Sequence, residues 1–158
     1  MENRKVLIVC TGNTCRSPMA ELLFKQLVFR KERLGIEVSS AGIAALNGAP
    51  ATPEAVTVLK EEGIDLSKHR SRALTEPMGR SADLILAMTV SQKKFILARY
   101  PYLSAKVFTL KEYSGASGGN PDIDDPAGST LAAYRFCAQE IKFNLEKIEE
   151  KIENTSGY

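Results

Sequence analysis

The chain has 158 residues, of which 44% are hydrophobic and 25% charged, and its net charge is +2. This length and composition suit one domain, residues 1–158, whose core needs no disulfide framework. The mild basicity does not indicate nucleic-acid binding, and the apolar run from Val6 to Cys10 is too short for a signal peptide or a membrane span. We expect a cytoplasmic monomer with neither nucleic-acid nor membrane partners.

Strand and helix signals alternate along the chain. The continuous apolar run Val6–Val9 is typical of a strand buried on both faces of a parallel sheet. A helix follows, which Ser17 can cap and whose first turn suits Pro18. The predicted strands cover residues 6–9, 36–40, 82–87 and 106–110. The first predicted helix begins at residue 17, and the others cover residues 52–62, 90–100 and 131–152. This alternation predicts an α/β fold with a parallel sheet and right-handed crossovers.

Two segments follow strands of the predicted sheet, where ligands bind in folds of this kind. One is the turn from Cys10 to Ser17. The other is the long loop from about Lys111 to Ser129. Because a loop of that length in a compact domain is usually functional or disordered, both segments are candidates for a site.

The turn reads Cys10-Thr-Gly-Asn-Thr-Cys-Arg16-Ser17. Backbone N–H groups at a helix N-terminus, after a loop that contains glycine, form an anion site, and no Gly-Lys-Ser/Thr follows that would make it a nucleotide loop. N–H dipoles and Arg16 should favour the thiolate of Cys10, which is a nucleophile, and Arg16 can grip two phosphate oxygens. Taken alone, Cys10 would be better explained as a buried strand cysteine before a polar turn, because buried free cysteines are common.

This turn resembles the active-site loop of the low-molecular-weight protein tyrosine phosphatase family. The resemblance extends over nearly the whole chain and includes Met19-Ala20-Glu21, Ser40-Ala41-Gly42 and Asp125-Pro126. It implies a single domain with a four-stranded parallel sheet flanked by helices, and a phosphate loop between the first strand and the first helix. It also implies phosphorylated protein substrates, a phosphocysteine intermediate, and no metal or other cofactor.

The resemblance also implies roles for individual residues. Asp125 precedes Pro126 as the general acid of the family precedes its proline, although the acidic cluster at residues 122–125 could also be a solvated turn. His69 is the only histidine, and we expect it to be a supporting residue rather than a base or a ligand. The residues expected to bind phosphate or substrate are Thr11, Gly12, Asn13, Thr14, Cys15 and Ser17, and those expected to brace the loop include Asn13, Ser17, Ser40 and His69.

The cysteines other than Cys10 are open to more than one interpretation. Cys15 can form a reversible disulfide with Cys10, for which the family offers a precedent, or can simply pack as a small hydrophobic residue. Cys137 lies on the apolar stripe of the last predicted helix and is expected in the core. One histidine and three scattered cysteines do not suit a zinc site.

Thr14 carries the most information about the substrate. Tyrosine-specific members of the family often have a bulky aliphatic residue here, whereas the bacterial protein-arginine phosphatase branch has the same Cys-Thr-Gly-Asn-Thr-Cys-Arg-Ser string. A hydroxyl can hydrogen-bond a guanidinium group, whose donors an aliphatic side chain would leave unpaired. Ala127 departs from both branches, because tyrosine-directed members usually have an aromatic residue after Asp-Pro and the arginine branch can also carry one.

The sequence therefore predicts a phosphatase that hydrolyses phosphoarginine in proteins. Three alternatives remain: a tyrosine phosphatase of the same fold, an arsenate reductase, and an inactive phosphate-binding module. An arsenate reductase needs further cysteines to relay a disulfide, and the chain offers only Cys15 and Cys137. Because Cys10, Arg16 and Asp125 occur together, an inactive module is disfavoured.

Overall fold

The computed structural model describes residues 3–33, 35–116 and 118–156. Four parallel strands form one sheet in the order β2-β1-β3-β4. The strands are β1 (Arg4–Cys10), β2 (Ile36–Gly42), β3 (Leu84–Ala87) and β4 (Val107–Thr109). The helices are α1 (Arg16–Arg30), α2 (Pro53–Glu61), α3 (Glu76–Ser81), α4 (Val90–Arg99), α5 (Leu110–Ser114) and α6 (Leu131–Ser156), with a short 3₁₀ turn, η1, at Pro101–Leu103.

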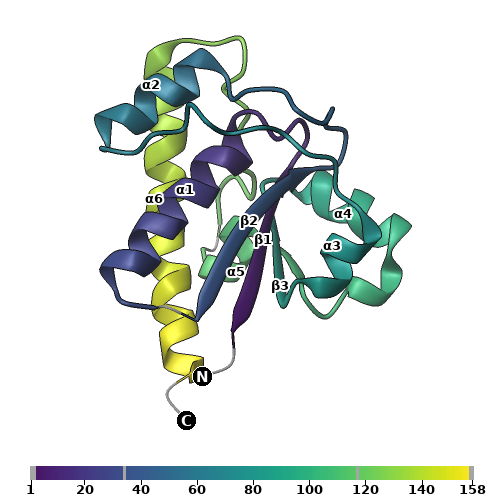
Figure 1. The fold of residues 1–158 in the computed structure, drawn as a ribbon. Coiled ribbons are helices and arrows are strands. Elements are labelled where there is room, and N and C mark those ends of the chain that lie inside the picture. Colours follow the sequence, from purple (N-terminus) through teal and green to yellow (C-terminus); the bar gives the residue numbers. More distant parts are fainter. Residues whose placement is uncertain (1–2, 34, 117, 157–158) are drawn as a thin grey trace.

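Helices cover both faces of the sheet (Figure 1). Helices α1, α2, α5 and α6 lie on one face and share a large apolar core with β1, while α3, α4 and η1 pack on the other face. Residues 6–10 of β1 are buried, as a strand in the middle of a covered sheet requires. The predicted α/β fold with a four-stranded parallel sheet is confirmed.

The register of β1 brings its last residue to the edge where ligands bind. Cys10 pairs with Gly42 at the end of β2, and Val9 pairs with Ala87 at the end of β3. The carboxyl ends of these three strands therefore meet beside the turn that leads from β1 into α1.

The start of α1 differs from the sequence prediction. The helix begins at Arg16, Cys15 occupies the N-cap position, and no side chain caps it. Ser17 is the second helical residue and cannot serve as the cap, so that prediction was wrong. Its hydroxyl is instead used by its neighbours in the turn, as described below.

Two short helices were not predicted. Helix α5 begins at Leu110, which was assigned to the fourth strand, because Thr109 and Glu112 form a capping box that ends the strand and starts a helix. Helix α3 has only six residues and contains Pro77 and Gly79, so the sequence gives no clear helix signal there. The expected loop after residue 111 thus begins with a helical turn, and Ser117 lies outside the described residues.

The remaining predicted elements lie within a few residues of those observed. Among the residues that the structure describes, no helix has both the length and the apolar character that crossing a membrane requires. The candidate site lies at the carboxyl edge of the sheet, between α1 and the segments that follow β2, β3 and α5.

Candidate active site

Hydrogen bonds from neighbouring segments hold the turn between β1 and α1. Four backbone carbonyl oxygens of the turn accept these bonds. Ile43 N donates to Cys10 O at 2.9 Å, Ala44 N to Thr11 O at 2.9 Å, His69 Nε2 to Asn13 O at 2.8 Å, and Thr52 N to Thr14 O at 2.9 Å. With the carbonyl oxygens turned outward to these partners, the N–H groups of the turn are left for another acceptor.

No described residue accepts a hydrogen bond from the backbone N–H of Gly12, Thr14 or Cys15. These groups directly precede an uncapped helix N-terminus, which carries partial positive charge. Unpaired N–H groups beside a helix N-terminus form an anion site of the size of a phosphoryl group. The turn is called the phosphate loop below.

Cys10 lies at the end of β1 with its sulfur inside this loop. Asn13 N donates to Cys10 Sγ at 3.3 Å, and Ser17 Oγ lies 2.9 Å from the same sulfur. Ser17 Oγ already accepts a hydrogen bond from Asn13 Nδ2 at 2.8 Å, so its own proton is free to point at Cys10. Two donors thus face the sulfur, which suits a nucleophile that must carry negative charge and later leave.

Asn13 is the hub of the loop. Its side chain is fully buried, and its backbone has a positive φ of 55°, which asparagine tolerates better than most residues. Besides Ser17, Asn13 Nδ2 also donates to Ser40 Oγ at 2.9 Å, and Asn13 Oδ1 accepts from Arg72 N at 2.9 Å. Ser40 in turn donates to Glu21 Oε1 at 2.6 Å, so β2 and α1 support the loop together.

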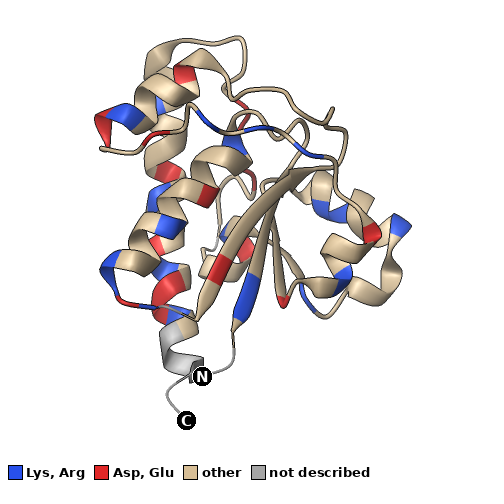
Figure 2. Ribbon diagram, viewed as in Figure 1, with Lys and Arg blue, Asp and Glu red and all other residues tan. Residues whose placement is uncertain are grey.

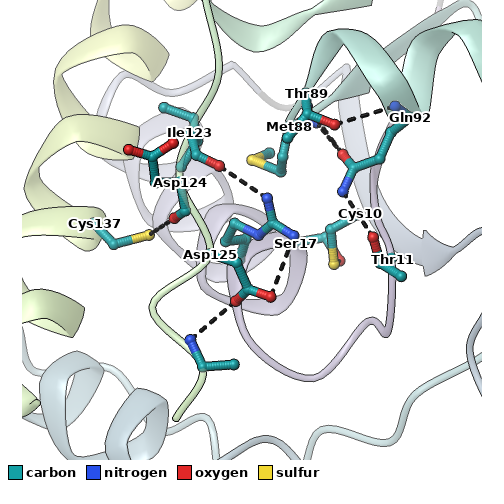
Figure 3. Close-up of polar contacts among 12 residues, drawn as sticks. Cys10, Thr11, Ser17, Met88, Thr89, Gln92, Ile123, Asp124, Asp125 and Cys137 are labelled. Carbon is teal, nitrogen blue, oxygen red and sulfur yellow. Dashed lines mark hydrogen bonds and ion pairs between the residues drawn. The ribbon is translucent and has the colours of Figure 1, made fainter. Parts of the chain in front are cut away.

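Arg16 links the loop to the segment that carries Asp125. It is 5% exposed, and Nη1 donates to Ile123 O at 2.8 Å. Nη2 lies 3.6 Å from Asp125 Oδ2, and Asp125 Oδ1 accepts from Ala127 N at 3.0 Å (Figure 3). The Asp125 side chain is 51% exposed, so it stands at the entrance of the site while Arg16 forms its base.

All three cysteines are free and buried in the structure. Burial raises the pKa of Cys15, and the nearby Cys137 adds to this effect. Burial likewise raises the pKa of Cys137, from 9.0 to about 12. Both therefore remain protonated at neutral pH and are poor nucleophiles, which favours the packing interpretation for Cys15 in the reduced protein.

The Thr14 side chain is half-buried in the loop, and no described residue hydrogen-bonds its hydroxyl. A free hydroxyl in this position is available to a ligand. Ala127 contributes a backbone N–H to Asp125 rather than a ring to the entrance.

Charge is distributed unevenly around the loop. Lys68, Arg70 and Arg72 are exposed on the segment that joins α2 to α3, and Figure 2 shows basic residues along this segment where it passes the loop. Asp124 and Asp125 are exposed on the segment between α5 and α6. Within the described part of the chain, no three His, Cys, Asp or Glu side chains are grouped as metal ligands.

The roles that three residues play in this site were not predicted from the sequence. A Cβ on Gly42 would lie 2.5 Å from Thr11 O, so only glycine lets β2 approach the loop this closely. Asp122 Oδ1 accepts from Val90 N, and the buried Gln92 donates to Thr11. The Thr89-x-x-Gln92 spacing was a readable capping signal, but nothing local pointed to the contact with Thr11.

The arrangement has the parts needed for phosphoryl transfer to sulfur. A cysteine sulfur faces an anion cradle of N–H groups, a buried guanidinium lies at its base, and a carboxyl group stands at its entrance. Together they can attack phosphorus, stabilise the equatorial oxygens and protonate a leaving group.

Comparison with known proteins agrees with this chemistry. The model of the low molecular weight phosphotyrosine protein phosphatase family matches residues 5–156. The protein-arginine-phosphatase of Bacillus subtilis is 44% identical over 147 residues, which are 93% of this chain and 95% of that protein. The probable low molecular weight protein-tyrosine-phosphatase EpsP of Ralstonia solanacearum is also 44% identical, over 90% of this chain and 92% of its own.

A solved structure of a YwlE arginine phosphatase mutant with a phosphorylated active-site serine is 43% identical, with a TM-score of 0.89. The match covers 94% of this chain and 95% of that one.

Proposed function

The chain belongs to the low molecular weight phosphotyrosine protein phosphatase family, and on that premise we propose that it hydrolyses phosphoarginine in proteins. It is a cysteine-dependent protein phosphatase of the kind to which its relatives belong. The substrate we infer is the one named for the Bacillus subtilis and Geobacillus stearothermophilus relatives. The protein acts in the cytoplasm as a monomer.

The observation that carries this proposal is the free Thr14 hydroxyl in the phosphate loop. Overall identity does not separate the substrates, because a relative named as a tyrosine phosphatase is as similar as one named as an arginine phosphatase. A guanidinium group carries N–H donors next to the phosphorus, and each donor that loses its partner on binding costs about 1–3 kcal/mol. Thr14 Oγ1 supplies an acceptor for one of these donors, and the carbonyl oxygen of the protonated Asp125 carboxyl group supplies another.

The reaction takes two steps. Cys10 Sγ attacks phosphorus in line, the P–N bond breaks, and Asp125 gives its proton to the departing guanidine nitrogen. Asp125 then takes a proton from water, whose oxygen attacks phosphorus, and the S–P bond breaks to release phosphate and the Cys10 thiolate. Arg16 and the N–H groups of the loop stabilise the equatorial oxygens throughout, while Ser17 donates to the leaving sulfur.

Tyrosine phosphatase activity is the second candidate, because EpsP matches this chain at 44% identity. A tyrosine ring offers no N–H donors to Thr14. The absence of a ring at Ala127 also removes the stacking surface on which a phosphotyrosine would rest.

Two substitutions at Thr14 test the choice between these substrates. Thr14→Val removes the hydroxyl and keeps the shape, and Thr14→Ser keeps the hydroxyl. For a phosphoarginine protein, kcat/KM should fall about tenfold or more in Thr14→Val and stay within about threefold in Thr14→Ser. For a phosphotyrosine peptide, Thr14→Val should lose nothing. Equal losses on both substrates would show that Thr14 does not select the guanidinium group.

A further inference from the structure

Gln92 lies in the first turn of α4, between the end of β3 and the phosphate loop (Figure 3). Its side chain is 3% exposed, and its amide takes part in three hydrogen bonds. Oε1 accepts from Met88 N at 2.9 Å and from Thr89 N at 3.0 Å, and Nε2 donates to Thr11 Oγ1 at 3.1 Å. Because two N–H donors face Oε1, the amide has one possible orientation, with its NH₂ group toward Thr11.

Helix capping accounts for only part of this arrangement. Thr89 Oγ1 accepts from Gln92 N at 3.1 Å, and together with the bond from Thr89 N this completes a capping box. The bond to Thr11 is not needed for capping. It joins residues 81 positions apart in the sequence, and Thr11 is the residue that directly follows the nucleophile.

The loop that carries the acid is fixed to the same end of β3. Ile123 N donates to Met88 O at 2.9 Å, and Val90 N donates to Asp122 Oδ1 at 2.8 Å. Met88 N also donates to Val9 O at 3.1 Å, one residue before Cys10. The segment 88–90 is therefore hydrogen-bonded to both parts of the site: β1 with the phosphate loop that carries Cys10, and the segment that carries Asp125.

We propose that Gln92 is a positioning residue that fixes Thr11 against segment 88–90 and so keeps Cys10 and Asp125 in register during phosphoryl transfer. This inference rests on the proposed catalytic roles of Cys10 and Asp125, but not on which phosphorylated group is the substrate. Gln92 contacts neither the reacting atoms nor the anion site, and it acts through Thr11. In-line attack by Cys10 and protonation of the leaving group by Asp125 must occur together. A small shift of one residue relative to the other should therefore lower kcat and leave KM nearly unchanged.

A double-mutant cycle tests this coupling. Thr11→Val removes the hydroxyl and leaves the cap of α4 intact, and Gln92→Met removes both functions of the amide at similar volume. We expect Thr11→Val to lower kcat about threefold to tenfold with KM within about twofold, because one hydrogen bond is lost. Adding Thr11→Val to Gln92→Met should lower kcat no further, since the bond is already absent.

The choice of substrate sharpens the readout. 4-Nitrophenyl phosphate has a good leaving group and needs little protonation, whereas phenyl phosphate depends on the acid. The loss in kcat/KM should be larger on phenyl phosphate if the position of Asp125 relative to Cys10 is disturbed. A merely structural role would instead lower the unfolding midpoint and affect both substrates equally.

Gln92→Glu provides the conservative variant. Its carboxylate keeps both backbone partners and can accept a hydrogen bond from the Thr11 hydroxyl, so kcat should stay within about threefold of the wild type. This variant and Thr11→Val decide the question even if Gln92→Met does not fold. Wild-type kcat in Thr11→Val, additive effects in the cycle, or a loss in Gln92→Glu as large as that in Thr11→Val would each overturn the proposal. A preference of the wild-type enzyme for phosphotyrosine would overturn only the substrate proposal and would leave the role of Gln92 unaffected.

Discussion

Replacing Asn13 with alanine should both destabilise the protein and disable it. The change removes three side-chain hydrogen bonds, to Ser17, Ser40 and Arg72, from a fully buried site. At about 1 kcal/mol each, these amount to roughly 3 kcal/mol. Alanine at a φ of 55° adds about 1 kcal/mol of backbone strain. We therefore expect the free energy of unfolding to fall by about 4 kcal/mol, which is a drop in melting temperature of about 8–16 °C for a chain of this size.

Asn13→Gly is the matched control, because it loses the same bonds but accepts the positive φ. It should be about 1 kcal/mol more stable than Asn13→Ala, and both should lose activity because Ser17 is no longer oriented toward Cys10. Urea denaturation of the three proteins measures the difference. If Asn13→Ala unfolds within 1 kcal/mol of the wild type, or if glycine is the worse replacement, Asn13 is not the hub described here.

Three further predictions follow from the site. Asp125→Asn should lower kcat/KM, which reports the leaving-group step alone, by about 10²- to 10⁴-fold on phenyl phosphate and much less on 4-nitrophenyl phosphate, as steady-state kinetics can show. Gly42→Ala should destabilise the protein by about 1–3 kcal/mol in urea denaturation, because its Cβ would meet Thr11 O at 2.5 Å. Cys137 keeps its proton in the folded state up to about pH 12, whereas the unfolded thiol ionises near 9.0, so stability should fall as pH rises through this window. Cys137→Ala should reduce that slope by up to about 1.4 kcal/mol per pH unit, measured by denaturation between pH 8 and 11.

Each of these has an outcome that counts against it. Equal losses of kcat/KM on both aryl phosphates would remove the acid role of Asp125. A stable Gly42→Ala protein would show that β2 and the loop can move apart. An unchanged pH slope in Cys137→Ala would mean that its thiol is not held protonated by burial.

The local chemistry of the site could be predicted because it is contiguous in sequence. Cys10 and Arg16 lie on one strand–turn–helix unit, so their placement follows from a buried apolar run and a helix start. Asp125 required the family resemblance, since an Asp-Pro pair in a long loop is otherwise an ordinary turn. The structure brings its carboxylate to within 3.6 Å of Arg16 Nη2.

The contacts that brace the site could not be predicted in the same way. Gln92 and Thr11 are 81 residues apart, and their meeting depends on the pairing of β1 with β3. Gly42 is required by a single close approach that a sequence pattern does not encode. Ser17 was misplaced as a helix cap because its polar side chain suits that role equally well. In the folded loop its hydroxyl lies against Cys10 Sγ, which agrees with the bracing role that the family resemblance implied.

The most direct test of the account is an internal competition between the two substrates. One peptide that carries both a phosphoarginine and a phosphotyrosine, treated with the wild-type enzyme and followed by phosphorus NMR, gives the ratio of the two kcat/KM values in a single reaction. The account predicts that phosphoarginine disappears first, and that a Cys10→Ser protein leaves both groups in place. Loss of phosphotyrosine ahead of phosphoarginine would contradict the proposed substrate, and turnover by Cys10→Ser at the wild-type rate would contradict the proposed nucleophile.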